Sequence, residues 1–453
     1  MGKVLKKELA FTVSTPILER LALHRPELRA WAAYDWANSA FVTTVVTAVF
    51  PIYFSSVAAA DLPPAVATAR FAFATTCALV VVAVASPLLG AIADVTPVKK
   101  RLLGGFLALG VFTTALLFLV GRGDWLLGAI LFALANVGLN GSFVFYDALL
   151  PHVAREDELD RLSTAGYALG YVGGGLLLAL NLAWIQRPAW FGLGAAAARD
   201  PTLPARLAFL SVAVWWAVFS LPLFRHVREP AVGATVPARA AVRTALGRLA
   251  DTARALRAYP EAALLLVAFL VYNDGIGTII RMAAIYGSEI GIGQGALIAA
   301  ILLVQFVGIP CSFLFGAVAS RIGAKRAIFG GLAIYCGIAI VGYFMRTAVH
   351  FFALAVLVAV VQGGTQALSR SLFASLVPPE RSGEFFGFFS VSEKVAGIVG
   401  PAVFAATAAA TGSSRAAVLA VIAFFAVGAA LLARVDVEAG RAAAQAPVTS
   451  RGV

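Results

Sequence analysis

The sequence predicts an all-α polytopic membrane protein whose twelve transmembrane helices form two six-helix repeats. Hydrophobic residues make up 61% of the 453 residues and charged residues only 13%. A soluble domain is usually about half apolar and about a quarter charged, so this chain has too little charge to cover a soluble surface. Its long apolar blocks, such as 264–270, also differ from the short alternating segments of a membrane β-barrel.

The apolar segments define the helices in order. A membrane-spanning helix needs about 20 mostly apolar residues. Twelve segments meet this condition, at roughly 31–57, 71–93, 102–121, 125–149, 162–184, 207–224, 260–286, 294–319, 327–345, 350–374, 385–408 and 416–433. The even number predicts that both termini lie on one side of the membrane.

The domain organisation follows from these spans. We expect an N-terminal arm (1–30), a first six-helix half (31–224), a basic linker (225–259), a second six-helix half (260–434) and a disordered tail (435–453). The Arg-rich linker is expected to form an amphipathic helix on the anionic inner leaflet, or else a solvated connection between the halves.

The net charge of +12 would suggest a nucleic-acid partner in a soluble protein. In a membrane protein the position of the charges matters more. Most Lys and Arg residues outside the spans lie on the side of the termini, so we expect both termini in the cytoplasm, in a bacterial plasma membrane, and no nucleic-acid partner.

The sequence matches itself at an offset of about half its length. The repeated features are a Gly-Ala pair, a basic pair in the loop that follows, and an amide pair at i,i+4 spacing: Gly90-Ala91 with Gly316-Ala317, Lys99-Lys100 with Lys325-Arg326, and Asn136/Asn140 with Gln362/Gln366. Two repeated six-helix halves around a central site are typical of carriers, in which one half rocks against the other.

The loop after span two resembles the signature loop of the major facilitator superfamily, G-x-x-x-D-(R/K)-x-G-x-(R/K)-(R/K). It contains Gly90, Asp94 and the run Lys99-Lys100-Arg101, and it departs from the pattern at Val95 and Pro97. The second copy lacks the Asp, which is Ser320 here, and it keeps Gly316, Arg321, Gly323, Lys325 and Arg326. We expect the two loops to act as paired gating latches.

Further stretches resemble one branch of that superfamily, the vacuole-effluxer or autophagy-related type. They are 34–41 (YDWANSAF), 272–275 (YNDG), 280–287 (IRMAAIYG) and 362–371 (QGGTQALSRS). The resemblance implies the twelve-helix carrier fold and transport of a polar solute. Eukaryotic members of the branch are associated with amino-acid efflux from the vacuole, so the resemblance includes amino acids among the expected solutes, by efflux or uptake.

Asp94 is a candidate switch because it lies where span two meets the cytoplasm, close to three cations. A carboxylate at this position can pair with a cation or a helix N-terminus in one state of a carrier and lose that partner in the other. The alternative is an ordinary charged residue at a helix end.

Ionisable and amide residues within spans one and seven are candidates for a cavity or a proton site. Ionisable groups in the membrane are costly and usually mark a pathway or an internal ion pair. The residues are Asp35 and Asn38 in span one, and Asn273, Asp274 and Arg281 in span seven. The alternative is a structural ion pair that braces the two halves.

Spans four and ten carry the repeated amide pairs, Asn136/Asn140 and Gln362/Gln366, and Arg370 extends the second stripe. Amides offer both donors and acceptors, so opposed pairs can bind the carboxylate, ammonium or hydroxyl groups of a small polar solute. The alternative is hydrogen bonding between helices.

Glu393 and Lys394 in span eleven are the last candidates. Lys394 is expected near the middle of the membrane, where an ammonium needs a partner or a water-filled cavity. We expect it to pair with Asp274, which lies at a similar depth in span seven. The pair is either broken by solute or proton during transport, or is a fixed salt bridge.

Several function classes are disfavoured. The sequence has no phosphate-binding G-x-x-x-x-G-K-(S/T) loop and no H-E-x-x-H motif, and its four His residues lie outside the spans or at their ends. We therefore expect a gradient-driven transporter rather than an enzyme, with no metal or cofactor and with the proton as a candidate coupling ion. A membrane-embedded enzyme, a receptor and a lipid scramblase are the alternatives, and the sequence gives no indication of the oligomeric state.

Overall fold

The protein is described from a computed structural model, which covers residues 17–230, 259–289, 291–292, 294–396, 399–411 and 414–445. Over these ranges every regular element is a helix, which confirms the predicted fold class. Within the described part of the chain, eleven helices are long and apolar enough to cross a membrane. The remaining predicted span, 385–408, is divided into two shorter helices, α15 (Ser382–Val395) and α16 (Val399–Thr411).

The first half contains six spans. The first runs from Pro26 to Ala58 and combines α2 (Pro26–Ala40), the π-helical η1 (Phe41–Val49), α3 (Phe50–Tyr53) and the π-helical η2 (Phe54–Ala58). The others are α4 (Pro64–Val95), α5 (Lys99–Leu116) with η3 (Leu117–Leu119), α6 (Trp125–Val153), α7 (Leu159–Gln186) and α9 (Leu203–His226). The short η4 (Pro188–Phe191) and α8 (Gly194–Arg199) connect α7 to α9.

The second half is also a bundle of spanning helices. Its helices are α11 (Pro260–Glu289), α12 (Gln294–Ile322), α13 (Ala324–Tyr343), α14 (Ala348–Ser375), η5 (Pro379–Arg381), α15, α16, α17 (Ser414–Ala420) and α18 (Ile422–Arg434). The expected linker helix lies outside the described residues except at its ends, 225–230 and 259. The expected disordered tail includes a helix, α19 (Val437–Gln445), because it packs onto the bundle through Gly440, which contacts Leu376 and Glu261.

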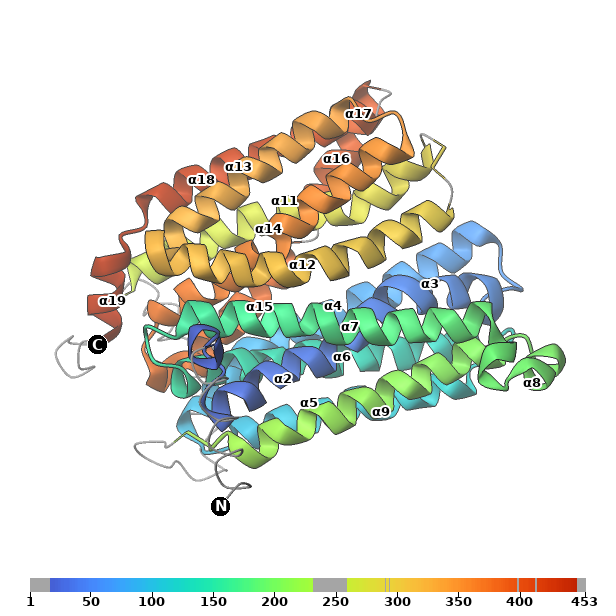
Figure 1. Ribbon diagram of the computed structural model, residues 1–453, viewed down its shortest axis with the longest axis horizontal. Coiled ribbons are helices and arrows are strands. Elements are labelled where there is room, and N and C mark those ends of the chain that lie inside the picture. Colours follow the sequence, from blue (N-terminus) through green and yellow to red (C-terminus); the bar gives the residue numbers. More distant parts are fainter. Residues whose placement is uncertain are drawn as a thin grey trace, which may run out of the picture.

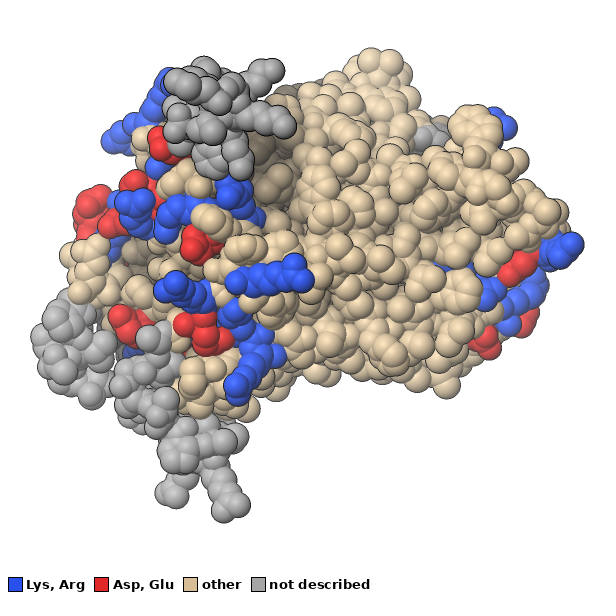
Figure 2. All heavy atoms as spheres, turned by 60° about the horizontal axis from the view of Figure 1, so that its bottom comes forward, with Lys and Arg blue, Asp and Glu red and all other residues tan. Residues whose placement is uncertain are grey.

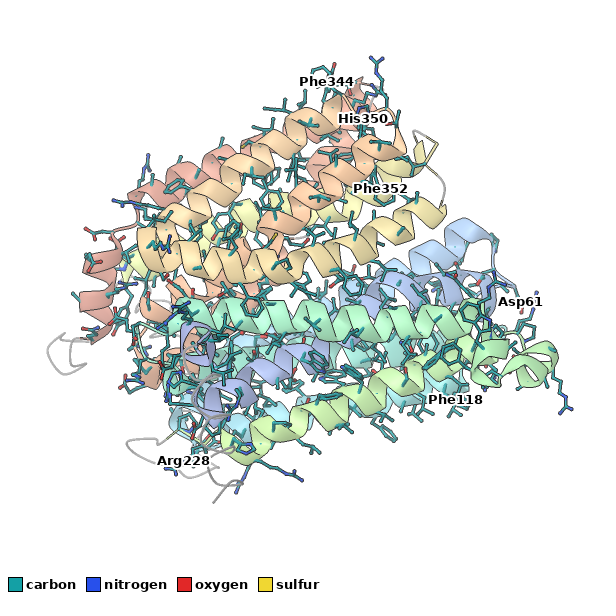
Figure 3. The ribbon with its side chains drawn as sticks, viewed as in Figure 1. Asp61, Phe118, Arg228, Phe344, His350 and Phe352 are labelled. Carbon is teal, nitrogen blue, oxygen red and sulfur yellow. The ribbon has the colours of Figure 1, made fainter. Side chains whose placement is uncertain are left out.

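The two halves lie side by side, with α2 to α9 in one and α11 to α18 in the other (Figure 1). Helix α2 begins and α18 ends at the same end of the bundle, which we call the basal end. The turns 96–98, 154–158 and 376–381 also belong to it. Arg228 lies at the basal end, whereas Asp61, Phe344 and His350 lie at the opposite, distal end (Figure 3).

The surface between the two ends is apolar. Figure 2 shows a band without Lys, Arg, Asp or Glu that separates two charged ends, with more charge at the basal end. Large apolar side chains on the helices point outward there; Phe73 is 69% exposed and Val84 is 75% exposed. A surface of this kind is unstable in water and suits the hydrocarbon core of a bilayer.

Candidate functional site

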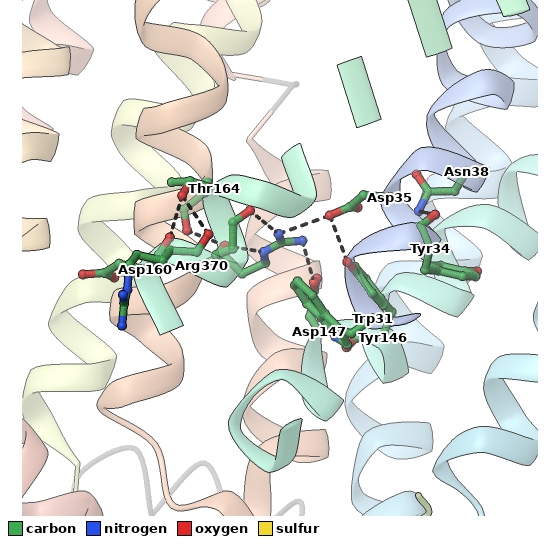
Figure 4. A network of polar contacts seen from close by, with 12 residues as sticks. Trp31, Tyr34, Asp35, Asn38, Tyr146, Asp147, Asp160, Thr164 and Arg370 are labelled. Carbon is green, nitrogen blue, oxygen red and sulfur yellow. Dashed lines mark hydrogen bonds and ion pairs between the residues drawn. The ribbon is translucent and has the colours of Figure 1, made fainter. Parts of the chain in front are cut away.

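Arg370 lies at the centre of a buried polar cluster between the two halves. It belongs to α14 in the second half, and its side chain reaches into the first half (Figure 4). Its Nη1 donates to Asp147 Oδ1 at 3.2 Å, its Nη2 to Asp35 Oδ2 at 3.3 Å, and its Nε to Ser163 Oγ at 2.9 Å. All four residues are at most 6% exposed. We call Asp35, Asp147, Ser163 and Arg370 the Arg370 cluster.

Aromatic rings hold this cluster in place. The Tyr146 hydroxyl donates to Asp35 Oδ2 at 2.9 Å, and the Trp31 and Tyr146 rings stack with their centres 4.4 Å apart. The guanidinium carbon of Arg370 lies 4.8 Å from the ring centre of Trp31 and 4.7 Å from that of Tyr167. Aromatic faces attract a cation most strongly where water is excluded, so the rings support the charged Arg370 inside the protein.

A glycine makes room for the cluster. A Cβ atom on Gly166 of α7 would lie 2.4 Å from Asp35 Oδ2 and 3.3 Å from Arg370 Nη2. Any larger residue would therefore displace the carboxylate. The requirement for glycine is steric, because α7 approaches the ion pair directly.

Asp94 forms a second connection between the halves. It lies near the end of α4, and its carboxylate accepts hydrogen bonds from the backbone N–H groups of Gly383, at 3.0 Å, and Glu384, at 2.7 Å. These N–H groups belong to the first turn of α15, where the helix dipole favours a negative charge. Lys99 Nζ lies 2.7 Å from the same carboxylate.

Lys99 extends this connection to a third helix. Its ammonium donates to Ser382 Oγ at 3.0 Å, and it lies 3.3 Å from Nε2 of His152 on α6. Ser382 Oγ in turn donates to the carbonyl of Ala148 at 2.9 Å. We call Asp94, Lys99, Ser382 and His152 the basal latch. It joins the first turn of α15 to α4, α5 and α6.

The repeated glycines lie where the halves cross. A Cβ atom on Gly90 would lie 2.1 Å from the carbonyl oxygen of Gly383, so α4 and α15 touch through their backbones. A Cβ atom on Gly316 of α12 would lie 2.3 Å from Thr164 Oγ1 on α7. The two glycines of the sequence repeat therefore occupy equivalent crossings between the halves.

The basic residues of the two loops divide into two groups. Lys100 donates to the carbonyl groups of Phe224 and Val227 at the end of α9, and Lys325 donates to those of Ala433 and Val435 at the end of α18. Both lysines therefore bond within their own half. Arg101, Arg321 and Arg326 are exposed at the basal end, and Gly323, with φ of 88°, makes the turn into α13.

The amide residues Asn136 and Asn140 lie on the face of α6 that points away from α5. Gly138 of α6 packs against α5, which leaves Asn136 and Asn140 on the opposite face of α6. Their Nδ2 groups donate to backbone carbonyls one turn earlier, at 2.9 Å and 2.8 Å. Asn38 does the same with the carbonyl of Tyr34, at 2.8 Å.

In the second half, the Gln366 side chain donates to Asn273 Oδ1 at 3.3 Å, which joins α14 to α11. Gln362 is half-buried.

Asp274 is 1% exposed, and its Oδ2 accepts a hydrogen bond from the Gly400 N–H, at 2.8 Å, in the first turn of α16. Glu393 is half-buried, while the side chains of Arg281 and Lys394 lie outside the described ones. The pairing of Lys394 with Asp274 stays a prediction.

Sequence reasoning missed two members of the Arg370 cluster, Asp147 and Ser163. A usable signal for Asp147 was the repeated Tyr-Asp pair, at Tyr34-Asp35 and Tyr146-Asp147. Asp147 also follows Asn140 by seven residues, which places both on nearly the same face of α6. Ser163 carried no comparable signal, because a serine inside an apolar helix is common.

Comparison with known proteins agrees with this architecture. The family described as vacuole effluxer Atg22-like matches residues 62–445. The MFS-type transporter YxiO of Bacillus subtilis (strain 168) is 37% identical over 423 residues, which cover 90% of this chain and 94% of YxiO. Autophagy-related protein 22-1 of Phaeosphaeria nodorum is 24% identical, over 85% of this chain and 79% of its own length.

Solved structures show the same fold at low sequence identity. The major facilitator superfamily transporter FucP, in its outward conformation, is 13% identical with a TM-score of 0.68 over 91% of this chain and all of that one. The proton:xylose symporter XylE is 12% identical with a TM-score of 0.66, over 90% of this chain and 95% of that one. The protein thus has the major facilitator fold and belongs to the vacuole effluxer Atg22-like family.

Proposed function

We propose that the protein is a secondary active transporter that moves a small polar solute across the membrane by alternating access. The observation that carries this proposal is the Arg370 cluster. It joins the two halves through hydrogen bonds and ion pairs at the basal end, which can break and re-form without unfolding either half. Membership of a family of MFS-type transporters supports the same function.

The conformation fits a carrier that is closed at its basal end. The Arg370 cluster, the basal latch and the bond from Ser371 to Asp160 all join basal segments of the two halves. Opening the basal end requires these bonds to break together. The halves can then rock about the middle of the bundle and expose a central site on the basal side.

The amide residues in the middle of the spans are the proposed solute site, with amino acids as the proposed class of solute. An amino acid offers a carboxylate and an ammonium group, which amide N–H and C=O groups bind respectively. Asn136 and Asn140 in one half are related by the sequence repeat to Gln362 and Gln366 in the other.

We further propose that the basal end faces the cytoplasm of a bacterial cell. Arg29, Arg101, Arg225 and Arg321 are exposed at this end, and the positive-inside rule places such residues on the cytoplasmic side. The same arginines would contact the anionic headgroups of the inner leaflet.

Proteoliposomes test the proposed transport. The purified protein should take up at least one of three radiolabelled amino acids, an apolar, an acidic and a basic one, and a pH gradient should change the uptake. A fluorescent phospholipid in the same vesicles tests the lipid scramblase alternative. Lipid scrambling without amino-acid uptake would contradict the proposal.

The solute site has its own test. Cysteines at Asn136, Asn140, Gln362 and Gln366, one at a time in a protein without its three native cysteines, should react with small water-soluble thiol reagents. A transported amino acid should slow this reaction, because it covers the site. A cysteine at Ser320, which is exposed at the basal end, is a control that should react and that the solute should not protect. If all four positions stay unreactive in both states of the carrier, the site lies elsewhere.

A further inference from the structure

The charges of the Arg370 cluster do not balance. Asp35 and Asp147 are both buried, and they share one cation, Arg370. An uncompensated negative charge inside a membrane protein is costly. The cluster therefore favours the uptake of one positive charge.

The surroundings favour a proton over a metal ion. A metal ion needs several oxygen ligands that converge on one point. Here Asp35 and Asp147 bind different nitrogens of Arg370, and the Trp31 and Tyr167 rings flank the guanidinium. Among the described residues, no group of three His, Cys, Asp or Glu side chains is placed to hold a metal. A proton needs only one carboxylate oxygen.

The two carboxylates differ in their hydrogen bonds. Asp35 Oδ2 accepts from the Tyr146 hydroxyl and from Arg370 Nη2. Asp147 Oδ1 accepts from Arg370 Nη1. Hydrogen bonds to the charged form of a carboxylate stabilise that form, so the carboxylate with fewer donors takes up a proton more readily.

We propose that Asp147 is the binding site of a coupling proton, and that its protonation releases the basal closure. The proton adds to a carboxylate oxygen of Asp147, which becomes a neutral carboxyl group. The ion pair between Asp147 in the first half and Arg370 in the second is then lost, which weakens the link between the halves and favours opening of the basal end. This inference rests on the proposed transport function, because it assigns the step that links the ion to the movement of the halves.

Other titratable groups face this region and must be separated from Asp147 in any test. They are Asp35 on α2, Tyr167 on α7, Arg370 on α14 and Glu393 on α15, and, nearer the basal end, Asp94 on α4, Lys99 on α5 and His152 on α6. Asp160 on α7 offers a matched control. It also receives a hydrogen bond across the two halves, from Ser371 rather than from Arg370.

Spin labels test the proposal without knowledge of the solute. Cysteines replace Arg101 and Ser320, which are exposed at the basal ends of the two halves, in a protein whose three native cysteines are serines. The distance between the labels reports basal closure. Between about pH 9 and about pH 5, the ratio of open to closed protein should rise by up to about tenfold per pH unit, the limit for one proton.

Single-residue variants identify which residue causes the pH response. Asp147→Asn should be largely open at every pH, because it mimics the protonated residue, and Asp147→Glu should keep the pH dependence. The control Asp160→Asn should also keep it, since Asp147 still titrates there. Asp35→Asn should shift the response to lower pH, because Asp147 then shares Arg370 with no other carboxylate. In infrared spectra, the carbonyl band of a protonated carboxyl group that appears at low pH should be absent in Asp147→Asn.

Two outcomes overturn the proposal. One is an unchanged pH response in a folded Asp147→Asn protein. The other is an infrared carboxyl band that disappears in Asp35→Asn and persists in Asp147→Asn, which would make Asp35 the proton site. Neither outcome affects the uptake of amino acids, so failure of this inference is distinguishable from failure of the proposed transport function.

Discussion

Single residues at the basal end hold the two halves together. Asp94 receives two backbone hydrogen bonds from the other half, and Arg370 donates to two carboxylates and a serine there. Buried polar bonds of this kind are strong when complete, and they are costly to leave half-made. The bonds of Asp94 and of Arg370 are therefore suited to a basal end that is either fully closed or fully open.

Replacing Asp94 with Asn should slow transport several-fold and leave the protein folded. Asparagine keeps one acceptor for the N–H groups of α15 but loses the ion pair with Lys99. Initial rates of amino-acid uptake by equal amounts of reconstituted protein measure the effect. The control is Asp61→Asn, because Asp61 is an exposed carboxylate at the distal end. Wild-type rates in a well-folded Asp94→Asn protein would show that this residue is not part of a latch.

The sequence identified Asp35, Asp94 and Arg370 because ionisable groups are costly in or next to a membrane span. It did not identify their partners. The partner of a charged residue depends on which helices pack together and on how deep in the bundle each residue lies. The sequences of α2 and α14 do not show that their charged residues meet α6. The repeated Tyr-Asp pair and the seven-residue spacing from Asn140 were the local hints at Asp147.

At the scale of elements, one lysine in each half closes the carbonyl end of its last helix. Lys100 bonds to the end of α9, and Lys325 bonds to the end of α18. The end of a helix carries unpaired carbonyl groups and a partial negative charge, both of which an ammonium satisfies. The repeated basic pair of the sequence thus has a structural role within each half.

Replacement of either lysine by Met should lower stability by about 1 kcal/mol, because the carbonyl groups lose a cation while the apolar stem is kept. The apparent melting temperature in detergent should fall for Lys100→Met and for Lys325→Met. Because the two sites lie in different halves, their effects should add. Arg101→Met and Arg326→Met, which change exposed residues of the same loops, should have little effect. Equal losses in all four variants would contradict this role.

Glu158 fixes the turn between α6 and α7. Its side chain is 3% exposed and contacts Arg25, His24 and Arg155. Burial acts to raise the pKa of this carboxyl, but the backbone N–H of Arg155 and the charges of Arg25 and Arg155 outweigh it, so the pKa lies below its ordinary value of 4.5.

The lowered pKa of Glu158 predicts a pH dependence of stability. The ionised carboxylate stabilises the fold above its unfolded-state pKa, and this contribution is lost as pH falls through the lowered folded-state pKa. Glu158→Gln should therefore be less stable than wild type at neutral pH, and the difference should disappear in strong acid. Thermal unfolding of both proteins across this range measures it. A difference that grows towards acid would have the wrong sign.

The spans were predictable from the sequence, whereas the irregular parts of the helices were not. Hydropathy averaged over a window locates α4 or α14 well, but it does not detect where a helix changes its hydrogen-bond pattern. The π-helical stretch Phe41–Val49 and the division between α15 and α16 are both of this kind. Such irregular stretches within helices are frequently found at functional sites.

At the scale of the whole molecule, the sequence repeat becomes a structural symmetry. Gly90 and Gly316 lie at equivalent crossings between the halves. Tyr34 donates to Ser142 in one half, and Tyr272 bonds with Ser369 in the other. Equivalent contacts in both halves are what a carrier needs if each half is to move as a rigid body.

The crossing at Gly90 predicts how the whole molecule responds to one added methyl group. Gly90→Ala places a Cβ atom against the backbone carbonyl of Gly383, which cannot move aside, so basal closure is destabilised by about 1 to 3 kcal/mol. The closed state should become at least several times less populated, as measured by spin labels at the basal end. Gly316→Ala should have a smaller effect, because the Thr164 side chain can rotate away. In the control Gly105→Ala, the new methyl group has no heavy atom within 4 Å, and the ratio of open to closed protein should not change. If Gly90→Ala closes as completely as wild type, α4 and α15 do not seal the basal end.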